Sequence, residues 1–327
     1  MKLFFAKLFF LMLLVGAIVV HHWWRLEQHI QALGPVHGSR DILAKFIKLG
    51  QTNGNARLVI AGDSKAERQI DPRVFAAAGI PAANVAIPSG DLWSLVHTIE
   101  LLNLHKFKMP YLISVGGYQI NDGNIGKEAV SADLYFSFTP WERLRVFGST
   151  YFLEAYSQLK YENVYRNIKG FMDEVRRTDG FYPNGGFFGQ AAKPFSCIRM
   201  RHNSQASPYA TIRNIKTDGA RWRLFQEAIK KLESWGNPYV LYTSPPSKKG
   251  RECFGGTYAE DLERDFAAKV KEATKDLKRV RFVDLYFNAP FTIDDSHYYD
   301  PEHLGISGAQ IFSQWWVTYM KTENLLL

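Results

Sequence analysis

Short apolar runs alternate with longer stretches of helical spacing along most of the chain. The runs with the length of buried strands cover residues 57–61, 84–87, 111–115, 239–243 and 280–285. The helical stretches between and after them cover residues 72–78, 92–106, 218–235, 258–278 and 306–320. Strands that alternate with helices predict an α/β domain, in which helices cover both faces of a parallel sheet. In such a sheet the reactive residues gather where the strands end.

The longest apolar run, residues 8–20, lies near the start of the chain. Residues 3–24 offer enough positions for a helix that crosses a hydrocarbon core of about 30 Å. Lys2 and Lys7 favour a cytoplasmic N-terminus, and the tryptophans at 23 and 24 are typical of a membrane interface. A cleaved signal peptide is the alternative, but no small-x-small cleavage site follows the run. The pattern predicts a single-pass anchor in the inner membrane, with the rest of the chain in the periplasm or extracytoplasmic space.

These patterns divide the chain into five parts. We expect a transmembrane signal anchor, a stalk helix with a linker, the first part of the α/β domain, a helical insertion or cap, and the second part of the domain. Their respective ranges are residues 1–27, 28–55, 56–119, 120–215 and 216–327. The insertion is rich in aromatic residues, which could line a pocket, meet a partner, touch lipid or form its own small core.

Composition limits the classes of partner. A formal charge of +8 and a pI near 9.3 favour an anionic neighbourhood such as a phospholipid membrane or an acidic glycan. No nucleic-acid motif is present, and a membrane anchor argues against that role. Cys197 and Cys253 are the only cysteines, and they either form a disulfide or remain two buried thiols. Their spacing is not that of a metal site, and we expect neither a metal nor another cofactor.

Basic residues follow the end of the fourth predicted strand, at Lys248, Lys249 and Arg251. They either bind an acidic acceptor or form a solvated basic loop.

The chain also carries the parts of a serine nucleophile. A serine hydroxyl becomes reactive when an imidazole takes its proton and a carboxylate fixes the tautomer of that imidazole. Ser64 directly follows the first strand, and the run Asp300-Pro-Glu-His303 lies in a loop just ahead of the last helix. We therefore expect Ser64 as the nucleophile, His303 as the base and Asp300 as the orienting carboxylate. A second D-x-x-H run, which ends at His297, is the competing candidate.

These residues resemble the motifs of the SGNH, or GDSL-type, hydrolase superfamily. Gly62-Asp63-Ser64 resembles its first block, and Asp300-x-x-His303 resembles its last. The resemblance implies a flavodoxin-like three-layer α/β/α fold with strand order 2-1-3-4-5, and serine ester chemistry. It also implies an oxyanion hole that includes the backbone amides of Ser64 and of Gly90, which follows the second strand.

The third block of the family differs here. The usual G-x-N-D follows strand three, whereas this chain has Gly116-Gly-Tyr-Gln-Ile-Asn-Asp122. In strict register Tyr118 replaces the asparagine of the oxyanion hole. Gln119 is a second candidate for that donor, and Asn121 is a third if the loop bulges.

Within the superfamily, the anchor together with residues 62–72 and 303–309 resembles envelope acyl-transfer proteins. These are the alginate O-acetylation proteins and the D-alanyl teichoic acid transfer protein. The resemblance implies a membrane-bound O-acyltransferase as partner and an envelope polysaccharide as acceptor, with Ser64 carrying a short acyl group between them. A periplasmic esterase or deacylase would use the same residues. A non-catalytic glycan-binding or assembly subunit with an SGNH-like fold is the remaining alternative.

Overall fold

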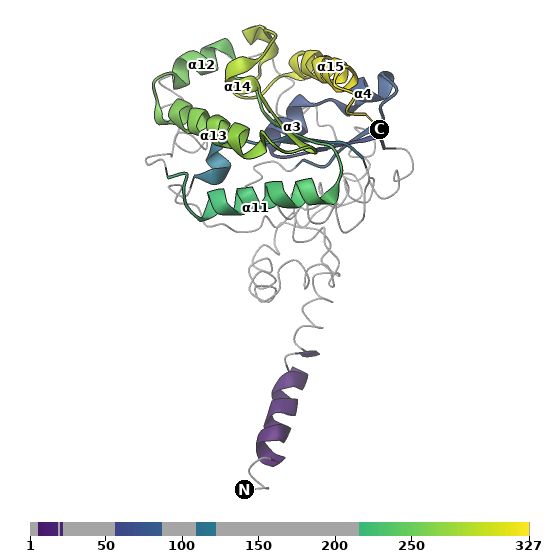
Figure 1. Ribbon diagram of the computed structural model, residues 1–327, viewed down its shortest axis with the longest axis vertical. Coiled ribbons are helices and arrows are strands. Elements are labelled where there is room, and N and C mark those ends of the chain that lie inside the picture. Colours follow the sequence, from purple (N-terminus) through teal and green to yellow (C-terminus); the bar gives the residue numbers. More distant parts are fainter. Residues whose placement is uncertain (1–5, 19, 22–55, 87–108, 122–215, 327) are drawn as a thin grey trace. The chain divides into compact units, whose positions relative to one another are not determined.

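The computed structural model describes residues 6–18, 20–21, 56–86, 109–121 and 216–326 (Figure 1). The chain forms two compact units, one of residues 1–43 and 130–172 and the other of residues 44–129 and 173–327. The predicted stalk and, apart from residues 120 and 121, the predicted insertion lie outside the described residues.

In the first unit, residues 6–18 and 20–21 are helical. Their large apolar side chains are exposed, and Phe10 is exposed to 72%. Within the described residues, no helix combines the length and the apolar character needed to cross a membrane.

The second unit contains a sheet of five parallel strands, which confirms the predicted α/β class. The strands are β1 (Leu58–Ala61), β2 (Ala82–Asn84), β3 (Tyr111–Ser114), β4 (Tyr239–Thr243) and β5 (Val280–Asp284). Their order is β2-β1-β3-β4-β5, as the resemblance implied. Ile60 pairs with Asn84 on one side and Leu112 on the other, so β1 lies inside the sheet and brings Ser64 away from its edges.

Helices flank the sheet on both faces (Figure 1). The described helices of this unit are α3 (Ser64–Gln69), α4 (Pro72–Ala77), α11 (Ala220–Trp235), α12 (Lys248–Phe254), α13 (Tyr258–Thr274), α14 (Leu285–Asn288) and α15 (Ile306–Thr322). The 3₁₀ turn η1 (Gly117–Ile120) follows β3. A second 3₁₀ turn, η4 (Asp295–His297), precedes the loop that leads into α15.

The side chains of β1 alternate between two cores. Val59 packs with the core residues of α11 and α13 on one face. Ile60 packs on the other face with the core residues of α3, α4 and α15, among them Trp316. Because successive strand side chains point to opposite faces, an unbroken apolar run predicts a strand buried on both sides.

Two local predictions were wrong. The second strand begins at Ala82 and ends at Asn84, earlier than predicted, and the Asn84 side chain bonds to the backbone on both sides of this end. Its amide donates to the carbonyl oxygens of Ala66, Glu67 and Ile70, and its Oδ1 accepts from the N–H of Ala86.

The basic segment after β4 is the helix α12 rather than a loop. Ser247 caps this helix, since its Oγ accepts from the N–H of Gly250.

Candidate active site

A tight turn after β1 places Ser64 at the first position of α3. Gly62 has φ +126°, and a Cβ atom at this position would lie 2.7 Å from the carbonyl oxygen of Ser114. Only glycine allows this backbone conformation and this close approach of β3 without strain. The next residue, Asp63, caps α3 because its carboxylate accepts from the N–H of Lys65. The nucleophile therefore stands on a rigid turn between a buried strand and a helix.

The loop before α15 brings His303 to this turn. The Ser64 Oγ and His303 Nε2 atoms are 3.0 Å apart. On the other side of the ring, Nδ1 lies 2.8 Å and 3.0 Å from the two carboxylate oxygens of Asp300. The backbone N–H groups of Glu302 and His303 also donate to Asp300, both at 2.8 Å. These backbone hydrogen bonds fix the Asp300 carboxylate, and the carboxylate orients the imidazole. A histidine that acts as the general base for a serine requires this arrangement.

Charges around the imidazole favour its protonated form. Burial opposes protonation, but the charge and hydrogen bond of Asp300 outweigh it and raise the pKa of His303. Glu302 acts in the same direction, and Lys65 opposes both. Burial alone would raise the pKa of the Asp300 carboxyl, yet contact with His303 and the two backbone N–H groups holds that pKa below its usual range. The pair is therefore poised to accept a proton from Ser64 and stabilise the resulting imidazolium.

Two side chains of α3 hold the loop that carries His303. Lys65 is buried, at 8% exposure, and its ammonium group lies 3.6 Å from the Glu302 carboxylate. Gln69 donates from Nε2 to the Glu302 carbonyl oxygen at 2.5 Å. Burial would lower the pKa of Lys65, but Glu302, Glu263 and Asp63 raise it, so the group remains charged.

Neither Lys65 nor Gln69 was among the site residues predicted from the sequence. For Lys65, the signal was its position directly after Ser64 together with the opposite charge of Glu302 inside the D-x-x-H run.

The competing histidine has different partners. His297 is partly exposed, and its Nδ1 lies 2.7 Å from the Ser307 hydroxyl. Its carbonyl oxygen accepts from the N–H of Gly305 at the start of α15. His297 thus belongs to the structure that positions the loop, whereas His303 reaches Ser64.

The candidate oxyanion donors lie in different surroundings. Ser64 is at the first position of α3, where a backbone N–H has no acceptor within the helix. Tyr118 donates its hydroxyl proton to Asp63 at 2.7 Å.

The amide candidates lie elsewhere. Gln119 is fully buried; its Oε1 accepts from the N–H of Gly116, and its Nε2 has no hydrogen-bond partner in the described part of the structure. Gly90 lies outside the described residues. Asn121 accepts from the backbone of Lys216.

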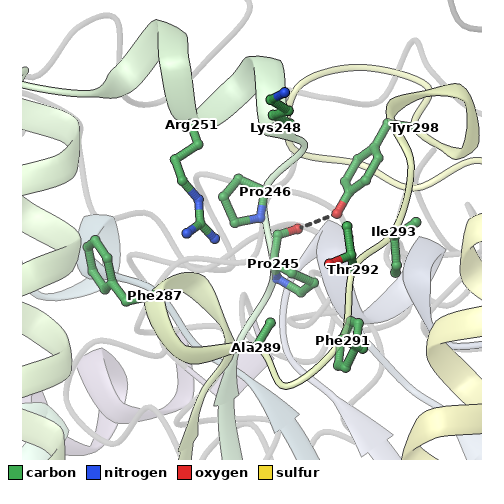
Figure 2. A pocket seen from close by; sticks show the side chains of 10 residues that line it. All are labelled: Pro245, Pro246, Lys248, Arg251, Phe287, Ala289, Phe291, Thr292, Ile293 and Tyr298. Carbon is green, nitrogen blue, oxygen red and sulfur yellow. Dashed lines mark hydrogen bonds between the residues drawn. The ribbon is translucent and has the colours of Figure 1, made fainter.

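The three basic residues after β4 all lie on α12. Lys248 and Arg251 line a cavity of about 310 Å³, whereas Lys249 is not among its lining residues (Figure 2).

Cys253, on the same helix, is disulfide-bonded, so the alternative of a free thiol does not hold for it. Cys197 lies outside the described residues. Among the residues that the structure describes, no cluster of histidine, cysteine and carboxylate side chains could hold a metal ion.

Comparisons with known proteins leave the chain without an assigned family. No family model matches it, and no curated protein does. A solved structure from Streptococcus pneumonia, provisionally named a platelet activating factor, is similar to it at a TM-score of 0.37 and 13% identity. That similarity covers 94% of this chain and 98% of the other.

Proposed function

We propose that this protein is a membrane-anchored, extracytoplasmic serine acyltransferase of the SGNH type. It moves a short acyl group onto a cell-envelope polysaccharide through an acyl-enzyme on Ser64. The observation that carries the proposal is the continuous contact from Ser64 to His303 and from His303 to Asp300. The serine turn directly after β1 and the strand order β2-β1-β3-β4-β5 support the SGNH assignment and its flavodoxin-like three-layer fold.

The first half-reaction forms the acyl-enzyme. His303 Nε2 takes the Ser64 proton while Oγ attacks the acyl carbonyl carbon, and the oxyanion accepts from the Ser64 N–H. Asp300 stabilises the imidazolium. When the tetrahedral intermediate collapses, the bond to the donor's leaving group breaks, and that group departs with the proton held by His303.

The second half-reaction releases the acyl group. His303 takes the proton of an acceptor hydroxyl, whose oxygen attacks the acyl carbon, and Ser64 leaves with the proton restored. Water at the same position gives hydrolysis, so a periplasmic esterase or deacylase uses the same residues. Transfer requires that a sugar hydroxyl outcompetes water. The predicted cap over residues 120–215 and a membrane-bound O-acyltransferase partner would supply that bias.

Two features support a location outside the cytoplasm at a membrane. The helix of residues 6–18 exposes large apolar side chains, as an anchor would in the absence of lipid. The disulfide at Cys253 is typical of an oxidising compartment. Together with the lysines that precede the apolar run, they favour an anchor in the inner membrane and a catalytic domain in the periplasm.

A fluorophosphonate probe tests for the activated serine. We expect the full chain to be labelled and the Ser64→Ala variant to remain unlabelled. Mass analysis of envelope glycans from a strain that carries Ser64→Ala then tests transfer, because a transferase variant loses acyl groups from a polysaccharide whereas an esterase variant gains them. An unlabelled wild-type chain would contradict the proposal.

One observation favours a non-catalytic assembly or glycan-binding subunit instead. The hydroxyl of Tyr118 is bonded to Asp63 and the amide of Gln119 is fully buried, so of these three described candidates only the Ser64 N–H remains as an oxyanion donor. The same labelling experiment separates this alternative from an enzyme, because such a subunit would not react with the probe.

A further inference from the structure

A cavity lies at the carboxyl end of the sheet beyond the serine and histidine. It has a volume of about 310 Å³ and lies where β4 and β5 end (Figure 2). Pro245 and Pro246 form one wall, Phe287 and Phe291 come from the segment after β5, and Tyr298 comes from the loop that carries His303. Flat, mostly apolar side chains therefore make up much of the lining.

Two cations complete the lining. Lys248 and Arg251 are three positions apart on α12, so they lie on one side of the helix. Arg251 donates from Nη2 to the Tyr286 carbonyl oxygen at 2.6 Å, which fixes the guanidinium, and Figure 2 shows it extending into the space that the lining residues surround. None of the ten described lining residues carries a carboxylate.

The loop that carries His303 packs directly against the residues that form the cavity. The Tyr298 hydroxyl donates to the Pro245 carbonyl oxygen at 3.1 Å, and the Ser247 N–H donates to that of Pro301 at 3.0 Å. At Gly250 a Cβ atom would lie 2.5 Å from the Pro301 oxygen, so α12 packs directly on the loop between Asp300 and His303.

From these contacts we propose that the cavity binds an anionic sugar unit of the acceptor polymer. The apolar face of a sugar ring fits against proline and aromatic surfaces, and the two cations pair with its carboxylate or phosphate. The inference rests on the proposed acyl transfer, because it identifies the acceptor of that reaction as an acidic polysaccharide.

The cavity and Ser64 lie at the ends of different strands. In the order β1-β3-β4, two steps of about 4.8 Å separate the ends of β1 and β4, a distance of about 10 Å. The sugar in the cavity is thus a neighbour of the acylated unit along the polymer, and it positions the chain across the carboxyl edge of the sheet.

Calorimetry on the purified full chain tests this proposal. The probes are an oligogalacturonate hexamer, the same hexamer after carboxyl reduction, and glucose 6-phosphate. We expect an anionic probe to bind, and carboxyl reduction of the hexamer to weaken binding about tenfold. Lys248→Glu and Arg251→Gln should each weaken binding of the anionic probe by about tenfold, whereas Lys230→Glu, a matched charge change on the exposed surface of α11, should stay within about twofold.

The outcomes separate this proposal from the proposed function. Binding by the phosphorylated sugar alone would support the cavity and identify phosphate as the anion. Binding by neither anionic probe, equal binding of the reduced hexamer, or an equal loss in Lys230→Glu would overturn it. Hydrolysis of p-nitrophenyl acetate by the wild-type chain, with Ser64→Ala as control, reports on the serine chemistry separately. Anion binding without hydrolysis would leave the cavity proposal standing and count against the enzyme.

Discussion

The loops after β1 and β3 leave the same edge of the sheet but direct their polar groups differently. After β1, Ser64 meets His303 across 239 residues of sequence, and both side chains retain some exposure. After β3, Tyr118 donates to Asp63, and the fully buried Gln119 accepts from the backbone of Gly116. The polar groups of the first loop meet at a partly exposed site, whereas those of the second make contacts within the protein.

The difference separates two functions that the proposed serine chemistry requires. For the proposed proton transfer the described residues supply both partners of Ser64, whereas of the described oxyanion candidates Tyr118 is bonded to Asp63, Gln119 is fully buried and the Ser64 N–H remains. The end of β3 and the loop after it instead support the turn that carries Ser64, since Ser114 and Tyr118 both donate to the Asp63 carboxylate that caps α3.

Replacement of the base should have the largest effect. His303→Ala removes the proton acceptor for Ser64, and we expect a loss of about 10³-fold or more in fluorophosphonate labelling rate. His297→Ala serves as the control and should keep most of the rate, because that side chain contacts Ser307. The reverse result would identify His297 as the base.

The next largest effect should come from Asp300→Asn. The amide cannot fix the tautomer or stabilise the imidazolium, so we expect about a 10³-fold slower hydrolysis of an activated ester. The wild-type rate should rise with pH through a midpoint above 6.5, because the base acts only when neutral and Asp300 raises its pKa. Loss of that charge should move the midpoint to lower pH. An unchanged midpoint would argue against direct coupling between the two residues.

Lys65→Met should have a smaller effect. It removes the cation that faces Glu302 and leaves that carboxylate buried, so we expect about a tenfold loss of rate together with a lower Tm. Lys65 lowers the pKa of His303, whereas Asp300 and Glu302 raise it. The rate profile of the variant should therefore shift to higher pH, and Lys65→Arg should restore the wild-type profile. A purely structural lysine would lower Tm without this shift.

Tyr118→Phe should have the smallest effect. Its hydroxyl donates to Asp63, so we expect a modest loss of stability, by about 2 kcal/mol, and less than a tenfold loss of rate. A loss of about 10²-fold or more, without a change in Tm, would mean that the hydroxyl turns toward the oxyanion during the reaction.

Periodicity predicted the strands and most long helices because both depend on repeated burial. It missed the short helices α3 and α12, whose starts are set by the caps Asp63 and Ser247 rather than by a repeated apolar pattern. The motif residues Ser64, Asp300 and His303 were predicted as a set, and the structure brings them together. The pairing of Lys65 with Glu302 was not predictable from spacing, because it depends on how α3 packs against the last loop.

The packing of residues 300–303 against the turn after β1 also sets the order of events in biogenesis. A growing chain carries Ser64 long before His303, and the two side chains meet only after α15 has docked on α3 and α4. Such distant contacts form late, after the local elements. The contact between Ser64 and His303 consequently forms only in a molecule in which the sheet and α15 have folded together.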